Sequence, residues 1–249
     1  MHGPPLFCAR PADAMPEYCL RKMNGSSMHP RKPPMHLLID LDGTLTDSRP
    51  GIITSIQYSL AENGLTVPAA ENLLWCIGPP IFESFRKLVG PESPHLFEPA
   101  ILKYRERYSL IGLFENEVYP EIRETLGELA GLGHTLHVAT SKAEIYARRI
   151  IDHFELAPYF ASVNGSELDG TRANKAELIA HILRAQDIPA AEAVMIGDRE
   201  HDMKGAKSNG IPAIGALWGY GTGAELMESG ATLCARVPRL LPELVGSLC

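Results

Sequence analysis

The stretch His36-Leu37-Leu38-Ile39-Asp40-Leu41-Asp42-Gly43-Thr44 decides how this chain is organised. A short apolar run bounded by turn residues is typical of a buried strand, and this run ends in two carboxylates separated by one leucine. Because strand side chains alternate, Asp40 and Asp42 are expected to point the same way, into the crevice where parallel sheets bind ligands. Two close carboxylates repel each other, and a divalent cation relieves that cost. A solvated acidic turn at a capped strand end is the alternative interpretation.

Composition bounds the class of protein. The chain has 249 residues, 45% of them hydrophobic, and a net charge of -7, which argues against a nucleic-acid surface. No apolar run approaches the roughly 18–20 residues that span a bilayer. The cysteines are scattered and form neither a disulfide framework nor a zinc motif: Cys8, Cys19, Cys76, Cys234 and Cys249. We therefore expect a cytoplasmic protein with no nucleic-acid or membrane partner.

Residues 1–34 differ from the rest of the sequence. Repeated prolines interrupt any periodic pattern, and no apolar segment of the kind found in secretory signals is present. We expect a disordered Pro-rich tail or an extension from an early start codon, with Met23, Met28 and Met35 as alternative starts.

Residues 50–116 contain helical patterns and no strong strand pattern. After Asp47 and Ser48, Pro50 fits the first turn of a helix. Further helices are predicted at Ala69–Trp75, Ile81–Val89 and Ile101–Ile111. This block interrupts two segments, 35–49 and 117–249, and we expect it to be a helical cap inserted into their common core.

From Pro120 onward, strands and helices alternate. Alternation of this kind predicts βαβ units and a parallel sheet. The fold class expected is α/β, a Rossmann-like parallel-sheet core with an inserted α-helical cap. The later predicted strands are Thr135–Ala139, Ala161–Val163, Ala193–Ile196 and Pro212–Ala216, and the helices between them are Ile122–Leu129, Ile145–Ile151 and Lys175–Leu183.

Polar side chains follow successive strands. Besides the first pair of acids these are Thr140, Lys175 at the next helix start, and Asp198 with Asp202. Singly, each has an ordinary explanation as a helix cap, a solvated helix face or a turn. Four such coincidences at one sheet edge favour a shared site. Carboxylates suit Mg²⁺, and a lysine with a hydroxyl would hold a phosphate.

In order and spacing, these residues resemble the four motifs of the haloacid dehalogenase-like (HAD) phosphohydrolases. The resemblance covers roughly 35–249. The helical block resembles the small cap of the phosphoglycolate phosphatase branch. Three shorter segments are similar to a sub-branch with 5′-nucleotidase-like members: Ile77-Gly78-Pro79-Pro80, Leu168-Asp169-Gly170-Thr171-Arg172 and Leu217-Trp218-Gly219-Tyr220-Gly221.

The resemblance implies a role for each acid. Asp40 would attack phosphorus to form an aspartyl-phosphate, and Asp42 would be the general acid and then the general base. Mg²⁺ would be held by the Asp40 side chain, the Asp42 main-chain carbonyl and Asp198. Asp202 would orient Lys175 or the metal-bound waters without itself contacting the substrate or the metal.

The phosphoryl group would be bound by the other candidates. Lys175 would pair with Asp40 and a phosphoryl oxygen, while Thr140 and the adjacent Ser141 donate to further oxygens. Gly78 precedes two prolines that open a helix, whose positive end is expected to face the pocket, so Gly78 is also a substrate-binding candidate.

The resulting functional prediction is a Mg²⁺-dependent phosphatase of small phosphorylated metabolites, a monomer or homodimer, most similar to 5′-nucleotidases. Phosphoglycolate phosphatase is the alternative, followed by a β-phosphoglucomutase-type phosphotransferase. A true dehalogenase would not need Asp42, and in a receiver-like phospho-acceptor module Asp42 would hydrolyse the signal. Aromatic cap residues Trp75, Phe82 and Phe85 favour a nucleoside leaving group, whereas Arg86 and Lys87 would suit a carboxylate.

Overall fold

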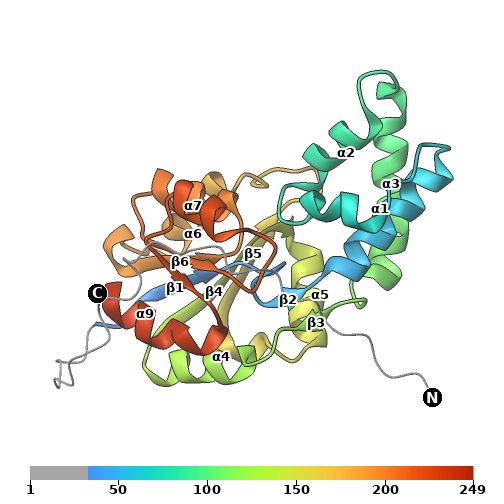
Figure 1. The fold of residues 1–249 in the computed structure, drawn as a ribbon. Coiled ribbons are helices and arrows are strands. Elements are labelled where there is room, and N and C mark those ends of the chain that lie inside the picture. The colour runs from blue at the N-terminus through green and yellow to red at the C-terminus, as the bar shows by residue number, and fades with distance from the viewer. Residues whose placement is uncertain (1–32, 249) are drawn as a thin grey trace, which may run out of the picture. The chain divides into compact units, whose positions relative to one another are not determined.

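β1, the strand predicted at His36–Ile39, lies in the middle of a six-stranded sheet (Figure 1). The computed structural model describes residues 33–248. The strand order is β5-β4-β1-β6-β7-β8 and every pairing in this sheet is parallel. The expected α/β parallel-sheet core is confirmed. The other strands are β4 (Thr135–Ala143), β5 (Phe160–Ser166), β6 (Ala193–Gly197), β7 (Ala213–Ala216) and β8 (Leu233–Ala235).

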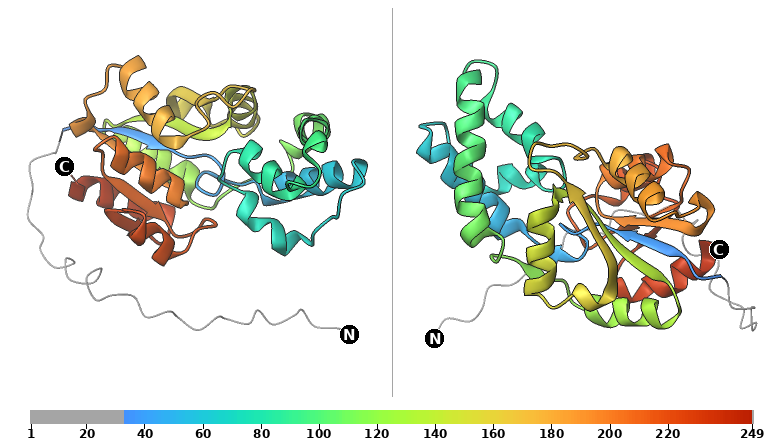
Figure 2. Two further views of the ribbon diagram at one scale, coloured as in Figure 1. Left: turned by 90° about the horizontal axis from the view of Figure 1, so that it is seen from above. Right: turned by 180° about the vertical axis from the view of Figure 1, so that it is seen from behind.

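Helices cover both faces of the sheet (Figure 2), because side chains of the central strand alternate between two apolar cores. Leu37 and Ile39 pack in the core that includes α4, α5 and α9, whereas Leu38 packs in the core that includes α6, α7 and α8. The bounds are α4 (Ile122–Gly131), α5 (Glu144–His153), α6 (Lys175–Ala185), α7 (Glu200–Ser208), α8 (Gly223–Glu228) and α9 (Leu241–Leu248).

Several elements differ from the sequence-based expectation. β4 continues past Ala139 to Ala143, and β5 spans seven residues, Phe160–Ser166, where three were expected. Both strands have polar residues near their ends, so the apolar pattern stops before the strand does. The main-chain pairing continues through these polar residues. β8 and the two helices near it, α8 and α9, were not predicted, because a three-residue strand is too short to show a period.

Between β2 (Thr46–Asp47) and β3 (Glu117–Val118) the chain is helical, and we call residues 49–112 the helical insert. β2 and β3 pair antiparallel, so the chain enters and leaves the insert through one two-stranded ribbon. The division into a core of 35–49 and 117–249 and a cap domain of 50–116 stays a prediction. Its elements are α1 (Arg49–Glu62), η2 (Ala70–Cys76), α2 (Ile81–Val89), η3 (Pro94–Leu96), α3 (Phe97–Arg107) and η4 (Tyr108–Gly112).

The helix expected at Ile101–Ile111 changes its winding part of the way along. α3 ends at Arg107, and Tyr108–Gly112 is a π-helical turn. Such turns are uncommon and occur frequently at functional sites. Gly51 of α1 packs against it so closely that a Cβ there would lie 1.9 Å from the carbonyl oxygen of Gly112.

Among residues 33–248, no helix combines the length and the apolar character needed to cross a bilayer. The tail expected at residues 1–34 lies outside the described residues, except for Pro33 and Pro34.

The buried His137 on β4 makes stability depend on pH. Its Nε2 lies 3.0 Å from Nδ1 of His36 and its Nδ1 lies 2.8 Å from the Ser162 hydroxyl. Burial, with a smaller contribution from His36, lowers the pKa of His137 to about 4.

We expect acid to destabilise the fold through His137. An unfolded histidine binds a proton below about pH 6.5, whereas the folded one stays neutral. The contribution of His137 is therefore complete above pH 6.5 and is lost as pH falls toward 4, by up to about 1.4 kcal/mol per pH unit. Urea unfolding from pH 7 to 4.5 measures the slope. His137→Gln, which cannot titrate, should give a shallower slope, and equal slopes would contradict the assignment.

Candidate active site

The strand-end residues predicted from the sequence meet at one edge of the sheet. Asp40 directly follows β1, and its main-chain N–H donates to the Ile196 carbonyl at 2.9 Å. Asp198 follows β6 on one side of β1, and Thr140 lies on β4 on the other. All three side chains are buried. The chain thus delivers groups that are far apart in sequence to neighbouring strands.

Lys175 begins α6 and reaches into this cluster. Asn174 caps that helix, its side chain accepting from the main-chain N–H of Ala176. The Lys175 ammonium lies 3.0 Å from Oδ1 of Asp40, 2.8 Å from Oδ1 of Asp202 and 2.8 Å from the Ala139 carbonyl. The contact with the Ala139 carbonyl is a hydrogen bond, and the contacts with the two carboxylates are ion pairs. Lys175 is thus held between Asp40 and Asp202.

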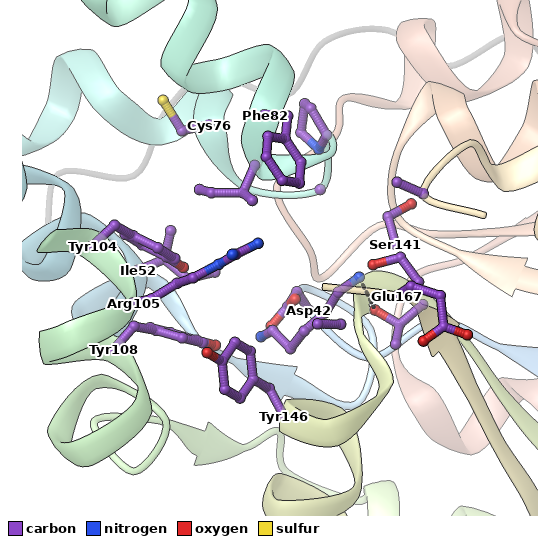
Figure 3. A pocket seen from close by; sticks show the side chains of 18 of the residues that line it. Asp42, Ile52, Cys76, Phe82, Tyr104, Arg105, Tyr108, Ser141, Tyr146 and Glu167 are labelled. Atoms are coloured by element: carbon purple, nitrogen blue, oxygen red, sulfur yellow. Dashed lines mark hydrogen bonds and ion pairs between the residues drawn. The ribbon is translucent and has the colours of Figure 1, made fainter. Parts of the chain in front are cut away.

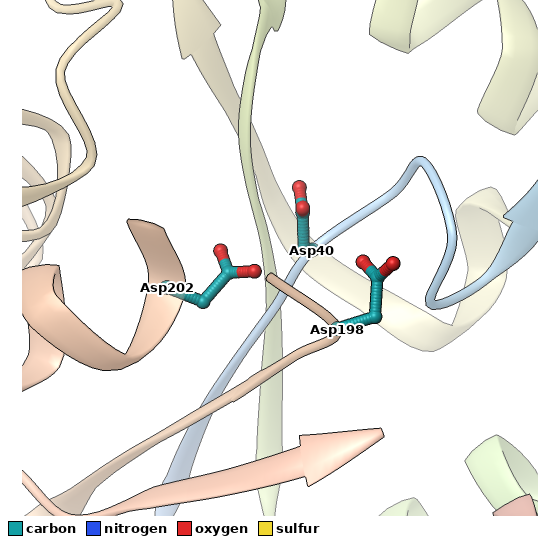
Figure 4. Close-up of side chains that lie close together, drawn as sticks. All are labelled: Asp40, Asp198 and Asp202. Atoms are coloured by element: carbon teal, nitrogen blue, oxygen red, sulfur yellow. The ribbon is translucent and has the colours of Figure 1, made fainter. Parts of the chain in front are cut away.

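Carboxylate oxygens of Asp40, Asp198 and Asp202 lie within 4.8 Å of one another (Figure 4). Asp198 is fully buried, and its two oxygens accept from the Thr44 hydroxyl at 3.2 Å and from the Tyr220 main-chain N–H at 2.8 Å. Gly43 has φ +84°, and a Cβ there would lie 2.2 Å from Oδ2 of Asp198. The glycine of the first motif is therefore required by this close approach.

The electrostatics of the cluster are dominated by burial of like charges. Burial, reinforced by Asp202 and Asp42 and opposed by Lys175, raises the pKa of Asp40 to about 7. Burial and the charges of Asp202 and Asp40 raise the pKa of Asp198 well above its usual range. Burial opposes the charge on Lys175, but Asp202 and Asp40 together raise its pKa. The acids thus hold more negative charge than Lys175 balances.

The charge of the cluster favours binding of a divalent cation. The cluster contains four carboxylates and two ammonium groups, so two negative charges are uncompensated when all six are ionised: Asp40, Asp42, Asp198, Asp202, Lys142 and Lys175. Buried charge without a partner is costly, and a hard cation with oxygen ligands neutralises it. Asp198 is the carboxylate least engaged by cationic side chains, which suits it to metal binding.

Asp42 is not among the three clustered carboxylates and pairs with a residue for which the sequence predicted no role. Its Oδ1 lies 2.5 Å from Nζ of Lys142, and both side chains are largely buried. The ammonium also lies 5.2 Å from the centre of the Tyr108 ring. Its position two residues after Thr140 is the feature of the sequence that could have marked Lys142 as a site residue.

A pocket opens from Asp40 and Asp42 toward the helical insert (Figure 3). Both the sheet edge and the insert line it, so the predicted Gly78 and Ser141 are brought together with the acids. The Ser141 hydroxyl is buried and has no hydrogen-bond partner among the described residues. The insert contributes Ile52, Cys76, Gly78, Pro79, Ile81, Phe82, Tyr104, Arg105 and Tyr108.

Most of the residues that were expected to select the leaving group lie outside the pocket. Of the three aromatic candidates only Phe82 lines the pocket, because Phe85 is buried inside the insert and Trp75 lies outside the pocket. Arg86 lies over the Phe97 ring at 5.6 Å and Lys87 over Trp75 at 5.3 Å, neither in the pocket. The arginine of the pocket is Arg105, one residue the sequence analysis missed.

Among the described residues, three arginines join the insert to the core through main-chain carbonyls, and one of them is Arg149 of α5, which donates to the Ser109 carbonyl at 2.8 Å. Arg105 of α3 donates to the Leu168 carbonyl of the core. Arg199, next to Asp198, donates to the Ile77 carbonyl of the insert, while its Nε lies 3.0 Å from Glu225. These three bonds tie the insert to the core.

Trp218 and Tyr220 bond to residues in and just after the first motif. Trp218 Nε1 donates to the Thr44 carbonyl at 2.9 Å, and the Tyr220 hydroxyl lies 2.8 Å from Oδ1 of Asp47. Neither they nor His201 are among the residues that line the pocket.

Comparisons with known proteins agree with this geometry. Residues 37–216 match the haloacid dehalogenase-like hydrolase family. A 5′-nucleotidase of Pseudomonas aeruginosa is 46% identical over 191 residues, covering 77% of this chain and 86% of that protein. The tyrosine-protein kinase PtkA of Mycobacterium tuberculosis is 40% identical over 220 residues, covering 88% and 74%.

A solved structure shows the same fold. It is described as a predicted phosphatase from Clostridium acetobutylicum, superposes with a TM-score of 0.81 at 37% identity, and matches 86% of this chain and 99% of that one. The four strand-end motifs, the sheet they end and these relatives agree. The chain belongs to the haloacid dehalogenase-like hydrolase family.

Proposed function

We propose that this protein is a Mg²⁺-dependent phosphatase that hydrolyses nucleoside 5′-monophosphates through an aspartyl-phosphate intermediate. The observation that carries the proposal is the buried group of Asp40, Lys175 and Asp198, of which Asp40 lines a pocket that the insert also lines. The identity of 46% to a 5′-nucleotidase supports the choice of substrate.

The chemistry divides one displacement into two steps. A carboxylate oxygen of Asp40 attacks phosphorus, and the bond from phosphorus to the ester oxygen breaks. Asp42 gives its proton to that leaving oxygen. Asp42 then removes a proton from water, whose oxygen attacks the phosphoryl group, and the bond to Asp40 breaks to release phosphate.

Other side chains bind and orient. The unpartnered Ser141 hydroxyl and the Thr140 side chain are suited to donate to phosphoryl oxygens, and Lys175 holds Asp40 in place. Asp202 fixes Lys175 through its Oδ1 while its Oδ2 accepts from the Arg199 main-chain N–H. Asp40, Asp198 and the Asp42 carbonyl would hold Mg²⁺. When bound, the ion supplies positive charge that offsets repulsion between a carboxylate and a phosphate.

One other reaction has specific support. Transfer of the phosphoryl group to a hydroxyl other than that of water is favoured by the identity of 40% to PtkA. The pocket wall also contains three tyrosines, Tyr104, Tyr108 and Tyr146.

A substrate panel tests the proposal. Phosphate release is measured with Mg²⁺ for nucleoside 5′-monophosphates, phosphoglycolate and β-glucose 1-phosphate, and a tyrosine peptide with a nucleoside triphosphate tests transfer. We expect the highest kcat/KM for a nucleoside 5′-monophosphate. A higher value for phosphoglycolate, or peptide phosphorylation without phosphate release, would contradict the proposed function.

A further inference from the structure

Arg105 extends from α3 into the middle of the pocket, between Phe82 and Asp42 (Figure 3). Its guanidinium carbon lies 5.4 Å from the centre of the Phe82 ring. Phe82 itself packs against the core, since a Cβ at Gly170 would lie 3.1 Å from the ring. The guanidinium is therefore held at the leaving-group side of the pocket, against an apolar wall.

Within the part of the chain that the structure describes, Arg105 forms no salt bridge. Arg107, two residues further along, contrasts with it by making two bonds to the Glu115 carboxylate, at 2.7 and 2.8 Å. Arg105 donates to the Leu168 carbonyl alone among residues 33–248. A guanidinium has five N–H donors and no acceptor, so most of its donors are available to a ligand.

A second side chain of the same wall also lacks a partner. Tyr108 is 1% exposed, and its hydroxyl has no hydrogen-bond partner among the described residues. Burial and the nearby charge of Asp42 raise its pKa well above the usual range, so the phenol keeps its proton. Unsatisfied buried hydroxyls are costly, and a ligand in the pocket would supply the missing partner.

The two groups lie about one helical turn apart and line the same pocket. Tyr108 lies on the Asp42 side, where the atoms nearest the ester oxygen must be, and its hydroxyl suits a sugar hydroxyl. Arg105 lies further out, beside Phe82, where a base would extend. The guanidinium has only hydrogen-bond donors. It therefore complements the edge of a base that presents only acceptors, and it is repelled by an edge that presents a donor.

We propose that Arg105 selects the base, favouring nucleoside 5′-monophosphates whose purine carries an oxygen at position 6. Hypoxanthine presents O6 and N7, two acceptors that a guanidinium can bond together, whereas adenine presents an amino donor beside N7. This inference rests on the proposed nucleotidase activity and specifies its substrate.

The test compares two substrates that differ in the group at position 6 and, with it, in the proton on N1. We expect kcat/KM for inosine 5′-monophosphate to exceed that for adenosine 5′-monophosphate by about ten-fold or more, the discrimination typical of a bidentate arginine contact. Arg105→Met should bring the ratio close to one. Arg105→Lys keeps the positive charge but lacks the two parallel N–H donors of a guanidinium, so it should give an intermediate ratio.

Arg86→Met is the matched control. Arg86 also lies over a phenylalanine of the insert, but outside the pocket, so its loss should leave the ratio unchanged. If Arg105 served only to hold the insert closed through Leu168, both substrates would slow equally and the wild-type ratio would persist in Arg105→Met. That result, or a wild-type ratio near one, overturns the inference while leaving the phosphatase proposal intact.

Two further outcomes are distinguishable. Phosphoglycolate turnover above that of inosine 5′-monophosphate, lost in Arg105→Met, would show that the guanidinium binds a carboxylate and would overturn the choice of a base. Absence of phosphate release from every substrate by the folded wild-type protein would overturn the proposed function and this inference together.

Discussion

Asp40→Asn is expected to lower phosphate release at least about a hundred-fold, the low end for losing one catalytic group, while the protein folds normally. An amide is a poor nucleophile toward phosphorus, and it also removes one negative charge from the buried cluster. Because like charges and burial already raise the pKa of Asp40, its loss should not lower stability through electrostatics. Steady-state assays and thermal melts of both proteins measure the two effects.

Asp42→Asn is the matched variant, since Asp42 lies in the same turn but has the other role. It should also be slow, but for a different reason, because the water that cleaves the intermediate loses its base. Intact-protein mass spectrometry should then show a phosphoryl group retained on Asp42→Asn and none on Asp40→Asn. Activity of Asp40→Asn above about a hundredth of wild type would show that Asp40 is not the nucleophile.

Removal of divalent cations should have an effect of similar size. We expect EDTA to eliminate activity and Mg²⁺ to restore it, with Ca²⁺ inhibitory because its larger and looser coordination misplaces the reacting groups. Binding to the folded state alone should also raise the melting temperature as Mg²⁺ is added. The cause is the excess of buried carboxylate charge around Asp198, which an added cation compensates.

Asp198→Asn separates binding from catalysis in this experiment. With one carboxylate fewer, the apoprotein should be no less stable, but the rise in melting temperature with Mg²⁺ should be reduced. Glu92→Gln, in an exposed turn of the insert, is the control and should keep the full rise. Full activity in EDTA, or an undiminished rise in Asp198→Asn, would exclude the proposed ion site.

The sequence predicted that the strand-end residues lie together, because the pattern that marks each of them is local. A buried strand followed by Asp40, or by Asp198, can be recognised from a few residues, and the parallel sheet then brings them together. The leaving-group side was predicted poorly. Arg105 and Arg86 are both basic residues on insert helices, and only the packing of the insert on the core determines which one enters the pocket.

The partners of the acids were equally inaccessible to sequence reasoning. Lys142 was visible beside Thr140, but its pairing with Asp42 depends on the extension of β4 beyond its apolar part. The three contacts of Lys175 depend likewise on how far α6 lies from β1, β4 and α7.

The ribbon of β2 and β3 has a mechanical consequence. Both passages of the chain into the insert cross it, close to Asp42, and Asp47 within it is bonded to Tyr220 of the core. For a body that swings about a pivot, displacement grows with distance from the pivot. If the insert turns about the ribbon, the bonds that join it to the core through Ile77, Leu168 and Ser109 must break. Asp42, the proposed general acid, lies next to the ribbon, so such a turn would open the pocket to substrate and product while displacing Asp42 little.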